Sequence, residues 1–106
     1  MRFMLTVTIP VETGNAAAKA GTLGSTIQAI LADAKPEAAY FTDEDGRRAA
    51  FLFVKMNDAS EIPAYAEPWM QAFDASIRFR PVMVAEDLAK AGGAIADAVE
   101  KFGGAS

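Results

Sequence analysis

Four side chains give this chain the means to hold a small ligand, namely Tyr40, Trp69, Arg78 and Arg80. The two arginines are two residues apart in a predicted strand, so they share one face of it, and adjacent guanidinium groups bind a carboxylate or a phosphate well. The tyrosine and the tryptophan each join an apolar ring to one polar atom, so either can stack on a ring compound. The tyrosine hydroxyl can also donate a hydrogen bond to a carbonyl or phenolate oxygen. We therefore predict these four residues as ligand-binding candidates.

The same four residues also have structural interpretations. The arginines can line a solvated edge or pair with carboxylates of a partner chain, and the two aromatic residues can serve in a core or an interface. Glu67 can act as a base if burial raises its pKa, whereas an exposed helix carboxylate needs no special role. The acidic run at residues 43–45 falls in a predicted turn, where such residues are common for backbone reasons. We therefore predict no metal site and no cofactor.

The chain has no cysteine and no histidine, which removes thiol nucleophiles, disulfides, thiolate metal sites and imidazole bases. Ten basic residues against fourteen acidic ones give a formal charge of −4, which argues against a nucleic-acid or anionic-membrane partner. No apolar stretch approaches a membrane span, and the N-terminus lacks the pattern of a secretory signal. We assign no catalytic residue and expect a cytoplasmic protein with one domain over residues 1–106.

Hydrophobic periodicity places these residues on four strands and several helices. Apolar residues alternate over residues 2–9, which predicts a first strand ended by Pro10. A short helix is expected at residues 15–20 and a longer one from Thr22, its N-cap, to the boundary before Pro36. Two strands, at residues 37–42 and 47–56, flank a polar turn at residues 43–46, in which Gly46 suits a positive φ angle.

The second half of the chain follows the same logic. A helix is predicted from residue 57 onward, with Pro63 tolerated in its first turn and Pro68 expected to kink or split it. A fourth strand fits residues 75–84, where Pro81 indicates an edge or a bulge. A last helical segment over residues 85–102 carries a narrow apolar seam that is interrupted by two glycines, and residues 103–106 are expected to fray. We expect the seam residues Leu88, Ile95 and Phe102 to pack on the sheet or on a partner.

The resulting order, β-α-β-β-α-β with a C-terminal helix, is typical of the ferredoxin-like α+β fold, an antiparallel sheet with two helices on one face. The third strand carries apolar side chains at both odd and even positions, so the other face also needs cover. Some of the following residues should lie there: Met4, Tyr40, Phe51, Leu52, Phe53 and Val54. We therefore predict a homodimer in which two such sheets meet as a dimeric α+β barrel.

Three segments of the chain form a distinctive pattern: residues 2–5 (Arg-Phe-Met-Leu), residues 35–41 (Lys-Pro-Glu-Ala-Ala-Tyr-Phe) and residues 66–69 (Ala-Glu-Pro-Trp) followed by Phe73. In this pattern the chain resembles, over nearly its whole length, a family of small bacterial proteins of unknown activity. That family is similar to the dimeric α+β-barrel superfamily, which implies a ferredoxin-like homodimer. Its members are sometimes labelled pantothenate synthetase. Enzymes with that activity are much longer and use a histidine-bearing nucleotide motif, whereas this chain has no histidine.

The wider superfamily includes cofactor-independent monooxygenases, isomerases, decyclases and haem-degrading enzymes, so its fold alone transfers no function. Haem chemistry does not suit a chain without a histidine to ligate the iron. Our first hypothesis is a cofactor-independent isomerase or monooxygenase acting on a small oxygenated ring compound in the cleft between sheet and helices. The alternative is a dimer without enzymatic activity that binds a small molecule or serves a structural role.

Overall fold

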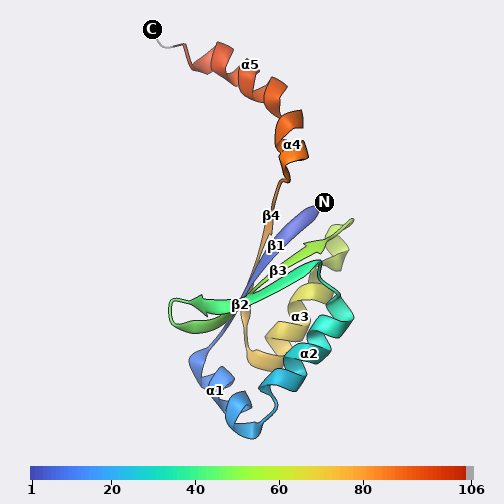
Figure 1. Ribbon diagram of the computed structural model, residues 1–106, viewed down its shortest axis with the longest axis vertical. Helices are drawn as coiled ribbons and strands as arrows, with labels where there is room; N and C mark the ends of the chain where they lie inside the picture. Colours follow the sequence, from blue (N-terminus) through green and yellow to red (C-terminus); the bar gives the residue numbers. More distant parts are fainter. Residues whose placement is uncertain (105–106) are drawn as a thin grey trace.

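The computed structural model describes residues 1–104, and its centre is a four-stranded antiparallel sheet with the order β2-β3-β1-β4 (Figure 1). The strands are β1 (Arg2–Ile9), β2 (Ala38–Glu44), β3 (Arg47–Lys55) and β4 (Ser76–Pro81). Helices α1 (Val11–Ala20) and α2 (Leu23–Ala34) connect β1 to β2. A 3₁₀ turn, η1 (Ala59–Glu61), and helix α3 (Ile62–Phe73) connect β3 to β4. The predicted α+β class, antiparallel sheet and element order are confirmed.

Helices α2 and α3 lie against one face of the sheet (Figure 1). The covered face receives the odd-numbered residues of β1 and the even-numbered residues of β3, because Leu5 pairs with Leu52 and Val7 with Ala50. The largest fully buried side chains form the centre of this layer: Trp69, Phe73, Leu5, Leu52, Val7 and Val54. One sheet face and the helices above it therefore make a complete core.

The β2–β3 hairpin is tighter than predicted. Glu44 pairs directly with Arg47, which leaves a two-residue turn at Asp45 and Gly46. Both turn residues have positive φ, 52° and 79°, as type I′ hairpins require. The expected four-residue turn is therefore wrong, because the Asp-Gly pair alone reverses the chain and the acidic residues before it continue the strand.

Three other features of the helices and strands differ from prediction. Helix α1 begins directly after Pro10 rather than at residue 15, since a proline suits a helix start and Glu12 lies in the first turn. Helix α3 continues through Pro68 without splitting, because the burial of Trp69 and Phe73 offsets the lost backbone hydrogen bond. Strand β4 ends at Pro81, earlier than predicted, and it is an edge strand as expected.

The C-terminal segment leaves the body of the protein instead of covering the sheet (Figure 1). It forms α4 (Ala85–Lys90) and α5 (Gly92–Phe102), which are divided at Ala91, directly before the glycine pair at which the break was predicted. We call residues 83–102 the arm. Packing of the arm on its own sheet is not observed, and the expected frayed end lies partly outside the described residues, at Ala105 and Ser106.

Candidate functional site

The uncovered face of the sheet, which we call the open face, carries three of the four candidate residues. The strand register places Tyr40 opposite Phe51, Phe51 opposite Thr6, and Thr6 opposite Arg78, so these four side chains form one row across the sheet. Arg80 lies in the next row, opposite Met4. The prediction that the two arginines share a face is confirmed.

The complete open face combines apolar and basic side chains. Of the six residues from which its apolar part was expected, Met4, Tyr40, Phe51 and Phe53 lie on it, whereas Leu52 and Val54 lie on the covered face. Its members from the four strands are Arg2, Met4, Thr6, Thr8, Ala38, Tyr40, Thr42, Glu44, Arg47, Ala49, Phe51, Phe53, Lys55, Ser76, Arg78 and Arg80.

Tyr40 is the most exposed aromatic side chain of this face, at 62%. Its ring meets the edge of Phe53 at a centroid distance of 6.4 Å and an interplanar angle of 81°, an edge-to-face contact that fixes the ring on the sheet. Its hydroxyl group makes no hydrogen bond within residues 1–104, so it is available to a ligand or a partner.

Arg78 and Arg80 stand on the exposed edge strand β4 and are themselves exposed. Across the described chain, neither guanidinium group takes part in a salt bridge. Since neighbouring strands are about 4.8 Å apart, the backbones of Tyr40 and Arg78 are about 14 Å apart across three strand spacings. Thr6 and Phe51 lie between them in the same row, where Thr6 is buried among its neighbours at 5% exposure and Phe51 is partly exposed.

Trp69 is not part of this arrangement. It is 1% exposed, it stacks at a tilt against Phe73 with ring centroids 6.2 Å apart, and it belongs to the core on the covered side of the sheet. It also borders a hollow of about 150 Å³ between helices and sheet, together with Phe41 and Arg48. The structure therefore brings Tyr40, Arg78 and Arg80 to one face and leaves Trp69 on the other.

Two further hollows lie away from the open face. One, of about 370 Å³, lies between α2 and α3 beside Tyr65 and Pro68. The other, of about 240 Å³, lies at the end of the sheet beside Met1, Phe3 and Ile62. In the described part of the chain, no group of three acidic side chains is arranged to hold a metal ion. Neighbouring residues of a strand point to opposite faces, which separates Asp43 from Glu44.

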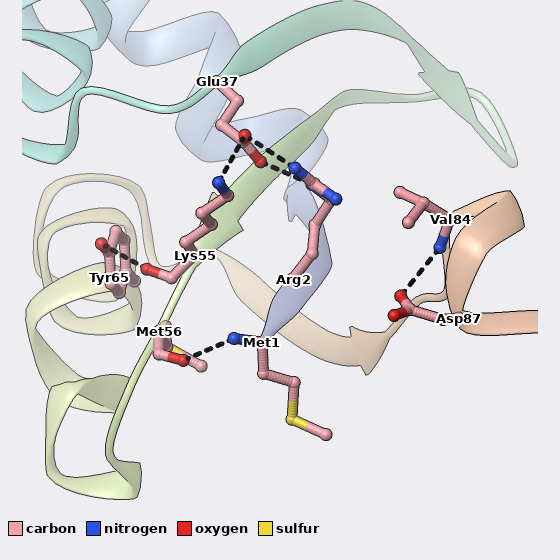
Figure 2. A network of polar contacts seen from close by, with 8 residues as sticks. All are labelled: Met1, Arg2, Glu37, Lys55, Met56, Tyr65, Val84 and Asp87. Atoms are coloured by element: carbon pink, nitrogen blue, oxygen red, sulfur yellow. Dashed lines mark hydrogen bonds and ion pairs between the residues drawn. The ribbon is translucent and has the colours of Figure 1, made fainter. Parts of the chain in front are cut away.

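An ion-pair network fixes one end of the sheet (Figure 2), the end near which Arg80 pairs with Met4. The carboxylate of Glu37 accepts two hydrogen bonds from Arg2, at 2.7 and 3.0 Å, and lies 3.8 Å from the Lys55 ammonium group. These bonds from Arg2 hold the pKa of Glu37 below its ordinary value of 4.5. Sequence reasoning missed this network, although charged residues at the ends of β1 and β3 and before β2 were its signal.

The arm begins at the same end of the sheet. The Val82 N–H donates to the Arg2 carbonyl at 3.0 Å, which continues the β4–β1 pairing by one residue. The Val84 N–H then donates to the Asp87 carboxylate at 3.1 Å, which closes the first turn of α4 (Figure 2). The root of the arm is therefore fixed beside Arg80, and helices α4 and α5 after it project from the body (Figure 1).

The chain belongs to the family described as a domain of unknown function, DUF3303, whose model matches residues 1–96. The match includes α4 and the first residues of α5, so the root of the arm is part of the family's domain. No protein of curated function matches this chain. In residues 1–104, no helix combines the length and the apolar character that crossing a bilayer requires.

Proposed function

We propose that this member of the DUF3303 family is a homodimeric small-molecule-binding protein. In it, the open faces of two copies meet as a dimeric α+β barrel, and the enclosed space takes a small aromatic carboxylate. The observation that carries the proposal is the pair of guanidinium groups of Arg78 and Arg80, which make no salt bridge within residues 1–104, beside the aromatic side chains of Tyr40 and Phe51 on a sheet face that no described helix covers.

The ligand class follows from the side chains of the face. Two adjacent guanidinium groups suit an anion with two oxygens, and a carboxylate can accept hydrogen bonds from both. Phe51 and Tyr40 offer apolar and aromatic surface for a ring, and the Tyr40 hydroxyl can donate to a polar substituent on it. A second copy that covers the face would exclude water and so strengthen each of these polar contacts.

The need for a second copy is supported by the surface of the single chain. It exposes 7005 Å², whereas a compact monomer of 11.2 kDa exposes about 5,700 Å². The projecting arm contributes to this excess of about 1,300 Å², which exceeds the roughly 800 Å² that each partner buries in a standard interface. A homodimer can therefore hide this excess without any further partner.

The test combines oligomeric state with ligand binding. Sedimentation at micromolar concentration should give a dimer. Benzoate and 4-hydroxybenzoate should raise the unfolding temperature in a concentration-dependent manner, whereas uncharged benzyl alcohol should not. Arg78→Ala should weaken benzoate binding about 10- to 100-fold, since a hydrogen bond to a charged group contributes about 1.5–3 kcal/mol. Tyr40→Phe should weaken 4-hydroxybenzoate binding by less than Arg78→Ala does.

A matched control is Lys19→Ala, which removes the same charge from α1, away from the open face. It should leave both ligand responses unchanged. A monomer in sedimentation, or equal ligand responses in wild type and Arg78→Ala, would contradict the proposal. Incubation of the bound acid under air, with the products analysed by mass spectrometry, separates binding from an isomerase or monooxygenase reaction at the same site.

A further inference from the structure

The arm projects from the body of its own chain (Figure 1). Among the described residues, its two helices contact each other, and no substantial contact joins either to the sheet or to α1, α2 or α3. The molecule is consequently 63 Å long, and its radius of gyration is 18.2 Å, against about 13 Å for a compact domain of this length. The arm accounts for this elongation (Figure 1).

The arm nevertheless has the sequence of a segment that packs against another protein surface. Val84, Leu88, Ala91, Ile95, Ala98 and Phe102 follow each other at alternating intervals of four and three residues, the spacing of an apolar seam. Leu88 and Ile95 are each 53% exposed and Phe102 is 86% exposed. Helices of six and eleven residues are too short to be stable alone in water, so the helical state of this segment requires a surface against the seam.

We infer that the arm is exchanged, so that the seam of each copy packs on the other copy, across the end of the paired sheets beside Arg80. The inference rests on the proposed dimer, whose partner it describes in more detail. Residues 85–102 span about 27 Å as helix, and facing sheets are about 10 Å apart. The arm is therefore long enough to reach a second body that lies against the open face.

Charge supports the second copy as the occupant. The arm carries four carboxylates, Glu86, Asp87, Asp97 and Glu100, against two lysines. The open face carries five cations, Arg2, Arg47, Lys55, Arg78 and Arg80, and one carboxylate of its own, Glu44, while Glu37 at its end already pairs with Arg2 and Lys55. An acidic arm is thus complementary to the basic surface that each copy presents, and it closes the end of the barrel next to the arginines of the proposed ligand site.

The absence of cysteine permits a direct test by energy transfer between labelled single-cysteine variants. Glu100→Cys carries a donor on the arm, and Asn57→Cys carries an acceptor at the end of the sheet. When the two labelled chains are mixed, transfer between them should develop as dimers re-form. Leu88→Glu/Ile95→Glu should abolish it, whereas Ala89→Glu/Ala96→Glu, which adds the same charges one residue beyond the seam, should not.

A chain that carries both labels distinguishes exchange of the arm from packing of each arm on its own body. If transfer in Glu100→Cys/Asn57→Cys survives dilution into excess unlabelled protein, each arm packs on its own body and the inference fails. If a dimer binds benzoate but shows no transfer between chains, the inference fails and the proposed function stands. If transfer occurs without benzoate binding, exchange stands and the ligand proposal fails.

Discussion

Replacement of Trp69 by alanine tests whether this candidate residue belongs to the core and not to the ligand-binding face. The side chain is 1% exposed and packs on Phe73 in the core. A tryptophan of this kind buries about 200 Å², which at about 25 cal/mol per Å² corresponds to about 5 kcal/mol. Because large-to-small core substitutions of Phe and Trp cost about 3–5 kcal/mol, we expect Trp69→Ala to destabilise the fold by about 4 kcal/mol.

The assay is urea unfolding followed by far-UV circular dichroism at a fixed protomer concentration. With a urea m-value of about 1–2 kcal/mol per M, the midpoint should fall by about 2–4 M. Met70→Ala is a matched control, since Met70 is the next residue of α3 and is 39% exposed. It should cost less than about 1 kcal/mol, because much of its side chain already meets water.

The two variants also separate stability from binding. Since Trp69 lies on the covered side of the sheet, its fluorescence should not change when benzoate occupies the open face. A Trp69→Ala variant as stable as the Met70→Ala control would refute the assignment of Trp69 to the core. Quenching of wild-type fluorescence in proportion to benzoate occupancy would instead place the ligand in the helix–sheet hollow that this residue borders.

Three further outcomes are expected. Hydrogen bonds from Arg2 lower the pKa of Glu37, so its contribution to stability is fully present above its ordinary pKa of 4.5 and is lost as the pH falls through the lowered value. The difference in unfolding temperature between wild type and Glu37→Gln should therefore shrink between pH 6 and pH 3, and a constant difference would contradict this. Gly46→Ala should destabilise the hairpin by about 1–2 kcal/mol in urea unfolding, because φ at this position is 79°, whereas Gly24→Ala, in a helix, should not destabilise. Finally, Phe51→Lys should shift the sedimentation equilibrium toward monomers, since it adds a cation to an already basic face, and Ile62→Lys, off that face, should not.

Side chains alternate between the two faces of a strand, and this alternation made most of the open face predictable. Arg78 and Arg80 are two residues apart, so their common face followed from the sequence, and so did the need to cover an apolar third strand. Which side chains join them depends on register, since a slip of one residue exchanges the two faces. A turn two residues longer than the observed one at Asp45 and Gly46 would have kept every side chain on the same face, so the face of Leu52 and Val54 stayed undetermined for another reason, namely that the third strand is apolar at both odd and even positions.

Other features depend on three-dimensional packing that no local pattern contains. Trp69 and Tyr40 have the same chemical character in the sequence, yet one is enclosed by helix and sheet and the other stands in the open. The helix start after Pro10 was missed because Gly14 weakens the local helical signal. That glycine is buried in the structure, where an added Cβ would lie 2.6 Å from the Arg48 guanidinium group. The seam of the arm was predictable, but its position away from the body was not.

Assembly and ligand binding are coupled in this protein if both use the open face. A ligand held between two copies binds the dimer more tightly than the monomer, so it must strengthen dimerisation by the same factor by which dimerisation strengthens its own binding. In the proposed dimer, Arg78 and Arg80 would set the sign of this coupling, because without an anion they would bring four guanidinium groups into one enclosed space. A carboxylate would neutralise part of that charge, and the acidic arm of the opposite copy would neutralise more. In the proposed dimer, the basic face of one copy and the acidic arm of the other would thus be two parts of one electrostatic arrangement.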